Sequence, residues 1–243
     1  MTEAGLRHIV VEGPIGVGKT TLARRLAQSF DSDLILEIPE ENPFLPQFYR
    51  DPRRHALPTQ LSFLFQRAQQ MQALRQRDLF QPVIVADFII DKDPLFARLN
   101  LTSDELNLYN LVYQQLAIDA PAPDLVIYLQ APVEVLKERI SRRRNDYERS
   151  ISAEYLQRLI DAYVEFFYHY TQSPLLIVNV ADVDLAGGQV EYDELLRIVR
   201  GGPVGRQYVN LRQKMSTAGP SVEQYRRRQL QMNSNPHDAE PAR

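Results

Sequence analysis

A glycine-rich motif near the N-terminus constrains the fold of this chain more than any other feature. Residues 13–20, GPIGVGKT, fit the pattern G-x-x-x-x-G-K-[ST]. An apolar run at 8–11 precedes the motif and is interpreted as a buried strand, and helical spacing over 19–30 follows it. An ordinary glycine turn before a helix is the alternative interpretation. Strand, glycine loop and helix in this order instead predict a phosphate-binding loop in an α/β fold.

Each part of this loop has a physical reason. Glycines let the backbone curl so that successive N–H groups converge on phosphate oxygens, and the N-terminus of the next helix adds a positive dipole end. The Lys19 ammonium is expected to reach the β- and γ-phosphates of a nucleotide, and the Thr20 hydroxyl is expected to hold Mg²⁺. The residues expected to bind ATP are Gly13, Pro14, Ile15, Gly16, Val17, Gly18, Lys19, Thr20 and Thr21.

Short apolar runs alternate with helical patterns along the rest of the chain. Further buried strands are predicted at 34–37, 83–86, 125–129 and 175–180. Together with the first strand they predict an α/β fold, in which a five-stranded parallel sheet carries helices on both faces. The later helices are predicted at 57–77, 102–118 (opening with a capping box), 133–143, 153–170 and 192–200.

One domain accounts for most of the chain. Its 243 residues, 44% of them hydrophobic, are enough for one sizeable core, and we predict a single domain over 1–212. From about residue 216 the composition becomes polar and offers little to bury. Residues 213–243 are therefore predicted to form a disordered tail.

Composition excludes several classes of function. The chain has no cysteine, which excludes disulfides, thiolate nucleophiles and cysteine-ligated zinc. Its formal net charge of −3 argues against nucleic acid as a partner. The N-terminal segment, residues 1–7, is short and polar, and no segment reaches the roughly 18 apolar residues that a membrane span needs. We therefore expect a cytoplasmic protein that contacts neither nucleic acid nor membrane.

A phosphate loop alone is compatible with GTPases, ATPase motors and small-molecule kinases. The chain lacks the N-K-x-D motif with which GTPases read guanine. It is short for a motor, and no acidic pair such as D-E ends one of its predicted strands. A kinase of small metabolites fits the size best.

Three further segments, taken with the loop, resemble the deoxynucleoside kinase family, of the deoxyadenosine, deoxycytidine and deoxyguanosine kinase type. The segments read LEIPEENPFLPQFYRDPRRHALPTQLSFLFQR, VIVADF and PDLVIYLQAPVEVLKERISRRRNDYERSISAEYLQRLIDAYVEFF. The resemblance spans roughly 7–170 and continues more weakly to about 210. It implies ATP- and Mg²⁺-dependent phosphorylation of a deoxynucleoside 5′-hydroxyl, with deoxyadenosine or deoxycytidine as the favoured acceptors. It also implies an arginine-bearing lid.

By this resemblance Glu37 is the general base, which takes the proton of the 5′-hydroxyl. A carboxylate at the end of a strand can orient a primary alcohol and deprotonate it as it attacks the γ-phosphate. Glu40 and Glu41 follow closely in the sequence and are rival candidates.

The resemblance also assigns the acceptor contacts. Tyr49 and Glu148 match positions that hold the sugar 3′-hydroxyl. Gln60 matches the residue that reads the base through its carboxamide, and Arg67 matches an arginine near the base. Phe96 is expected to stack on the base, with a purely structural core position as the alternative. The other glutamines of this predicted helix are interpreted as solvated: Gln66, Gln69, Gln70 and Gln72.

The phosphoryl group has its own expected residues. Asp87, at the tip of the third strand, matches the acid that places Mg²⁺ together with Thr20. Asp87 is also expected to border the substrate. Arg139 and Arg143 match lid arginines, which close on ATP and neutralise charge on the transferring group. Asp93 is a weaker candidate for a position near the base.

Two positions depart from the family pattern. Phe88 follows the strand-end acid where the family usually has arginine, and Lys92 is the nearest cation in the sequence that could serve instead. Asn145 stands where the lid usually has an arginine, and Arg144 could supply the missing charge. Because of these departures, we expect a working kinase that is slow or unusual.

Two alternatives stay open at this point. A nucleoside monophosphate kinase of the thymidylate type shares the loop and sheet, although an anionic acceptor would be repelled by the carboxylate of Glu37. A catalytically weakened, nucleotide-binding regulatory subunit is favoured by Phe88 and Asn145. The resemblance also implies a homodimer formed through helices. The helical segments 64–74 and 108–118 carry more apolar surface than one sheet covers, which agrees with this expectation.

Overall fold

The computed structural model describes residues 5–75, 83–116, 120–143, 145, 147–185 and 187–211, and the side chains up to residue 72 in the first range. The predicted tail at 213–243 lies outside the described residues. The same holds for Arg144 and for the last residues of two predicted helices, 76–77 and 117–118. Within the described part of the chain, no helix is long and apolar enough to cross a membrane.

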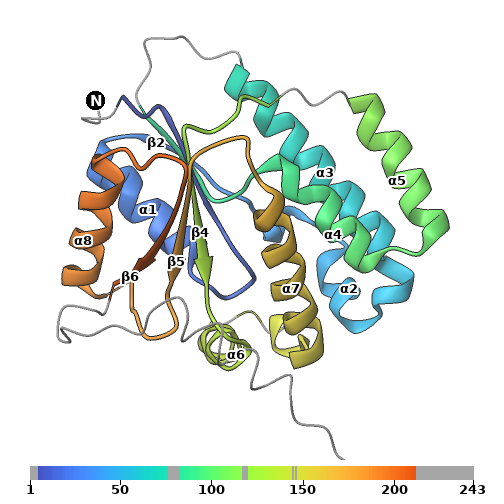
Figure 1. Ribbon diagram of the computed structural model, residues 1–243. Helices are drawn as coiled ribbons and strands as arrows, with labels where there is room; N and C mark the ends of the chain where they lie inside the picture. The colour runs from blue at the N-terminus through green and yellow to red at the C-terminus, as the bar shows by residue number, and fades with distance from the viewer. Residues whose placement is uncertain are drawn as a thin grey trace, which may run out of the picture. The chain divides into compact units, whose positions relative to one another are not determined.

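A parallel sheet of six strands forms the centre of the fold (Figure 1). In spatial order the strands are β2 (Asp33–Ile35), β3 (Ile84–Ala86), β1 (His8–Glu12), β4 (Leu125–Gln130), β5 (Leu175–Asn179) and β6 (Arg206–Asn210). The predicted α/β class is confirmed. The chain runs from β1 to β2 at the sheet edge and back to β3, and then passes to β4, β5 and β6 on the other side of β1, so the strand order changes direction beside β1. Ligands of such sheets bind at this switch point, beyond the carboxyl ends of the strands.

The predicted number of five strands was wrong, because β6 adds a sixth at the sheet edge. Its residues alternate between exposed and half-buried, and Tyr208 is 75% exposed. An edge strand with one partner needs no continuous apolar run, so the pattern used to find buried strands misses it.

Two apolar layers cover the sheet because successive strand residues point to opposite faces. Ile9 and Val11 of β1 face the layer built by α1 (Lys19–Phe30) and α8 (Gln189–Arg200), whereas Val10 faces α7 (Ala153–His169). Figure 1 shows α1 and α8 on one side of the sheet and α7 on the other.

The remaining helices build the walls of a site at the carboxyl ends of the strands. Next to α7 lies α4 (Asp93–Asn100), and α3 (Pro52–Arg75) and α5 (Ser103–Leu116) pack on α4 (Figure 1). The α5 helix opens with the predicted capping box, in which the Thr102 N–H donates to Glu105 and the Glu105 N–H to the Thr102 hydroxyl. Shorter elements are α2 (Leu45–Arg50), α6 (Val133–Arg142), η1 (Pro39–Glu41), η2 (Ile90–Lys92) and η3 (Glu148–Ser150).

Candidate active site

The phosphate loop connects β1 to α1 through backbone conformations that require glycine. Gly13 has φ 147°, and a Cβ there would lie 2.5 Å from the Leu129 carbonyl oxygen of β4. Gly16 has φ 84°, and its Cβ would lie 3.0 Å from the Leu136 carbonyl oxygen of α6. The glycine pattern in the sequence therefore reflects close backbone approach on both sides of the loop.

Lys19 begins α1, and its side chain lies along the loop. Its ammonium donates to the carbonyl oxygens of Gly13 at 2.7 Å and Pro14 at 3.2 Å. Burial and the nearby Lys92 ammonium lower the pKa of Lys19 to about 8, although three carboxylates act in the opposite direction. The lysine is therefore charged at neutral pH, and its ammonium lies next to the loop that would bind an anion.

Thr20 and Asp87 bring a hydroxyl and a carboxylate together beside the loop. The Thr20 hydroxyl donates to Oδ2 of Asp87 at 2.6 Å. Burial raises the pKa of Asp87 above its usual value. Among the described residues no group of three or more His, Cys, Asp or Glu side chains could hold a metal on its own. One carboxylate with one hydroxyl nevertheless fits Mg²⁺, which usually takes its other ligands from water and substrate phosphates.

Glu37 lies two residues beyond the end of β2, and its backbone is fixed from two sides. Its N–H donates to Oδ1 of Asp87 at 2.8 Å. From α3, the amide of Gln70 donates to the Leu36 carbonyl oxygen at 2.9 Å, and that of Gln66 to the Ile38 carbonyl oxygen at 3.2 Å. The interpretation of Gln66 and Gln70 as solvated was therefore wrong, because both side chains bind the backbone next to Glu37.

The Glu37 carboxylate is held by two cations. Arg67 contacts Oε1 through Nη2 at 2.6 Å and Nε at 2.8 Å, and the Lys92 ammonium lies 3.3 Å from the same oxygen. Burial raises the pKa of Glu37, but Arg67, Lys92 and Lys19 act more strongly together and lower it to about 2. Glu37 is therefore ionised at physiological pH.

The two rival carboxylates lie elsewhere. Glu40 and Glu41 belong to η1, and both side chains are exposed. Glu41 accepts a hydrogen bond from Gln66 at 3.1 Å. Of the three acids in this segment, only Glu37 lines the cavity described next.

A cavity of about 130 Å³ opens beside Glu37, between α2, α3, α4 and η3. Its lining includes Tyr49, Gln60, Phe96 and Glu148. The buried atoms Oε1 of Gln60 and Oε2 of Glu148 accept no hydrogen bond within the described part of the chain. The nearest described cation to Oε2 of Glu148 is Arg143, with Nη1 at 3.8 Å. Because buried polar atoms normally have hydrogen-bond partners, two such acceptors in one cavity indicate a site for a polar ligand.

Aromatic rings complete this cavity. Tyr49 stacks on Tyr147 with ring centroids 6.0 Å apart, and Phe96 meets Tyr163 edge-on at the same separation. Burial raises the pKa of Tyr49 well above its usual value, so its phenol keeps its proton. A phenol donor and the Glu148 acceptor can together bind one hydroxyl group.

Arg67 and Asp93 form a buried pair behind this cavity. Nη1 of Arg67 lies 2.6 Å from Oδ2 of Asp93, and the Tyr109 hydroxyl donates to Oδ1 at 2.9 Å. Arg67 is 3% exposed and Asp93 is fully buried. The guanidinium predicted to lie near a base therefore forms its described ion pairs with the carboxylates of Glu37 and Asp93, and it lies 5.1 Å from the centre of the Phe63 ring.

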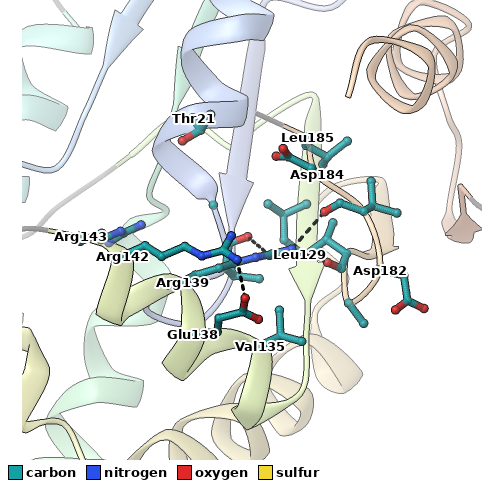
Figure 2. Close-up of a pocket in the computed structure, with 16 residues that line it drawn as sticks. Thr21, Leu129, Val135, Glu138, Arg139, Arg142, Arg143, Asp182, Asp184 and Leu185 are labelled. Atoms are coloured by element: carbon teal, nitrogen blue, oxygen red, sulfur yellow. Dashed lines mark hydrogen bonds and ion pairs between the residues drawn. The ribbon is translucent and has the colours of Figure 1, made fainter. Parts of the chain in front are cut away.

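A second cavity, of about 560 Å³, lies on the other side of the loop between α6 and the segment after β5 (Figure 2). Arg139 crosses it and donates to the carbonyl oxygens of Val17, Val180 and Val183 at 2.7–3.0 Å. Arg139 thus fixes the loop to the segment after β5. Gly16 and Arg143 line both cavities, so the two cavities adjoin at these residues.

The two departures from the family pattern have different surroundings. Phe88 is 1% exposed and packs with Met71 and Ile90 in an apolar cluster outside both cavities. Asn145 is half-buried, and its amide lies 3.5 Å from the Tyr147 hydroxyl.

Sequence reasoning missed Glu12, the last residue of β1. Its carboxylate is fully buried and lies 2.9 Å from the Lys92 ammonium. A charged residue directly after three apolar strand residues and before the first loop glycine was the available signal. Its partners come from distant parts of the chain, so the sequence did not indicate them.

Comparison with known proteins gives consistent matches. A family model described as deoxynucleoside kinase matches residues 9–200. Deoxyguanosine kinase of Bacillus subtilis (strain 168) is 39% identical over 157 residues, which cover 64% of this chain and 75% of that relative. Deoxyadenosine kinase of Dictyostelium discoideum is 31% identical over 209 residues, covering 84% of this chain and 82% of that relative.

A solved structure agrees with the fold. Deoxyadenosine kinase from M. mycoides with bound dATP superimposes with a TM-score of 0.69 at 24% identity, covering 79% of this chain and 98% of that chain. At this identity the likeness supports the fold alone.

Proposed function

Because the chain belongs to the deoxynucleoside kinase family, we propose that it transfers the γ-phosphoryl group of ATP to the 5′-hydroxyl of a deoxynucleoside. One observation carries this proposal. A phosphate-loop cavity and a cavity containing an oriented carboxylate, Glu37, adjoin at Gly16 and Arg143. Donor and acceptor held in adjoining cavities have the arrangement that direct phosphoryl transfer needs.

ATP is the proposed donor. Its phosphates lie against the backbone of 13–21, with Lys19 beside the terminal phosphates, and its base lies in the cavity crossed by Arg139. Arg139 acts by holding this cavity together, because its guanidinium already binds three carbonyl oxygens. Arg143 reaches the boundary between the cavities, where the phosphoryl group passes.

Mg²⁺ is the proposed metal, and Thr20 with Asp87 would hold it. When bound, the ion neutralises charge on the phosphates and fixes their orientation. The Asp87 carboxylate also binds the Glu37 N–H, so one side chain connects the proposed metal site with the proposed base.

Glu37 is the proposed base. All described hydrogen bonds and ion pairs of its carboxylate reach Oε1, which leaves Oε2 for the substrate hydroxyl. The 5′ oxygen bonds to the γ-phosphorus, the bond from that phosphorus to the β,γ-bridging oxygen breaks, and ADP leaves. The hydroxyl proton passes to Oε2. Since catalysis of this step rests mainly on positioning, a carboxylate of low pKa still orients the alcohol and receives its proton.

The sugar and base are assigned to the remaining lining residues. Tyr49 and Glu148 bind the 3′-hydroxyl, and the carboxamide of Gln60 pairs with the base edge, beside Phe96. An amide can pair with adenine, cytosine or guanine, so base preference follows from no single residue. Preference for deoxyadenosine or deoxycytidine stays a prediction, as do the homodimer and the cytoplasmic location.

A thymidylate-type kinase is the competing enzyme. Its acceptor carries a phosphate, which the carboxylates of Glu37 and Glu148 would repel. A regulatory subunit without activity is the competing non-enzyme. Phe88 and Asn145 favour it, since each stands where the family usually has an arginine.

The test is an ADP-release assay with ATP, Mg²⁺ and each of four deoxynucleosides, with thymidine monophosphate as a fifth acceptor. We expect turnover with at least one deoxynucleoside. Glu37→Gln should lower kcat by about 10²–10⁴-fold while nucleotide binding persists. Glu40→Gln, a nearby exposed acid, is the matched control and should keep the rate. Turnover only with the monophosphate would support the thymidylate-type alternative, and tight binding without turnover would support the regulatory one.

A further inference from the structure

Glu12 and Lys92 form a buried ion pair that the reaction described above does not use. Oε1 of Glu12 lies 2.9 Å from the Lys92 ammonium, and the two residues are 0% and 1% exposed. Taking both charges out of water is costly, and burying such a pair is a weak source of stability. Because Lys92 lines the same cavity as Glu37, this buried pair calls for a role other than stability.

Glu12 is fully engaged by four donors from three parts of the fold. Oε1 accepts from the Ile89 N–H at 3.0 Å and binds Lys92. Oε2 accepts from the Gly13 N–H at 2.9 Å and from the Tyr163 hydroxyl at 3.0 Å. An ionised carboxylate has about four acceptor positions, and all four are used here. Glu12 is thus a rigid anchor between the phosphate loop, η2 and α7.

Lys92 extends from this anchor to Glu37. It ends η2, and its ammonium lies 3.3 Å from Oε1 of Glu37 while it stays bound to Glu12. Burial lowers the pKa of Lys92, but the two carboxylates raise it more, so the side chain is charged. Phe88, where a cation is expected by family resemblance, packs instead in the cluster with Met71 and Ile90.

We propose that Lys92, anchored by Glu12, is a positioning residue that holds Glu37 in its reactive orientation. This inference rests on the proposed function, in which Glu37 is the base. Lys92 and Arg67 together bind Oε1 of Glu37 and so direct its Oε2 toward the cavity of about 130 Å³, where the acceptor is proposed to bind. The compact ammonium can bridge two carboxylates, whereas the forked guanidinium of Arg67 already spans Glu37 and Asp93.

The test compares Lys92→Met, Lys92→Arg and the double variant Glu12→Gln/Lys92→Met in the full chain. The double variant removes both buried charges, so it leaves neither unpaired and remains folded where the single variant could fail. Thermal melting and circular dichroism verify the fold. Lys137→Met is the matched control, because Lys137 is an exposed lysine of α6.

We expect Lys92→Met and the double variant to lower kcat by about 10- to 100-fold. In Lys92→Met, KM for ATP should stay within about threefold, since the Glu12 carboxylate and its hydrogen bond from the Gly13 N–H of the phosphate loop remain. Lys92→Arg restores the charge and should recover part of the rate. A merely structural role would change KM for ATP and for the deoxynucleoside together with kcat, and Lys92→Arg would not recover the rate.

Two results separate this inference from the proposed function. If Glu37→Gln retains full activity, Glu37 is not the base and the proposed function fails. If Glu37→Gln is inactive but the folded double variant keeps wild-type kcat, only the role of Lys92 is overturned.

Discussion

The guanidinium of Arg67 binds the carboxylate of Glu37 with two nitrogens, at 2.6 and 2.8 Å, and both reach the same oxygen. Its third nitrogen holds Asp93 at 2.6 Å. One fully buried side chain of α3 therefore fixes the proposed base against α4, the helix that begins with Asp93.

Arg67→Lys should lower kcat/KM by about 100-fold, because one ammonium cannot hold Glu37 and Asp93 in the same geometry. Steady-state kinetics with the best deoxynucleoside measures this loss. We expect melting temperature to fall as well, since Asp93 loses a buried partner. Arg98→Lys, at an exposed position of α4, is the control. Equal activity of the two variants would contradict the role given to Arg67.

The glutamines of α3 provide a finer test of backbone positioning. Gln70 binds the Leu36 carbonyl and Gln66 the Ile38 carbonyl, so Glu37 lies between two fixed points. The double variant Gln66→Ala/Gln70→Ala should lower kcat by about tenfold and change KM for ATP little. Gln69→Ala is exposed on the same helix and should behave as wild type. Equal kcat in both proteins would show that these hydrogen bonds are unnecessary.

Local signals explain which parts of this site the sequence predicts. The glycine spacing and the helix at 19–30 are local, and the structure has the helix at the predicted residues. Glu12 meets Tyr163, 151 positions away, and Gln70 meets Leu36, 34 positions away. The periodicity of a single helix or strand does not indicate such long-range contacts. The carboxylates of the site therefore lie close together only because the sheet brings its strand ends together. The edge strand β6 was missed because its exposed residues resemble a loop.

Activity should depend on pH through Lys19. Burial and Lys92 lower its pKa to about 8, so the cation is present below this pH and is lost above it. We expect kcat/KM for ATP, which reports the free enzyme, to fall above about pH 8. Bound phosphates raise the pKa of the lysine, so kcat should fall only at higher pH. Profiles between pH 6 and 10 check this order. A kcat/KM that stays level up to pH 9.5 contradicts it.

Asp87→Asn tests the proposed magnesium site. The amide is similar in shape but uncharged, and it cannot accept from Thr20 and Glu37 with both of its polar atoms. The Mg²⁺ concentration for half-maximal rate should rise at least about tenfold. Magnesium titrations at saturating ATP measure it. Asp124 binds the N–H groups of Arg7 and His8 at the start of β1, so Asp124→Asn should leave the magnesium requirement unchanged.

Phe88→Arg asks whether the arginine typical of the family would serve in this chain. The position is 1% exposed and lies against Met71 and Ile90, so an arginine there would be a buried cation without a partner. We expect a loss of about 3 kcal/mol or more in the free energy of unfolding. For a domain of this size that lowers the melting temperature by at least about 6 °C. Phe44→Arg, at a position 39% exposed, should cost little. Because Lys92 already supplies the cation at Glu37, kcat should not rise in the Phe88 variant. A stable Phe88→Arg protein with a higher kcat would show instead that the chain lacks a cation which this position can provide.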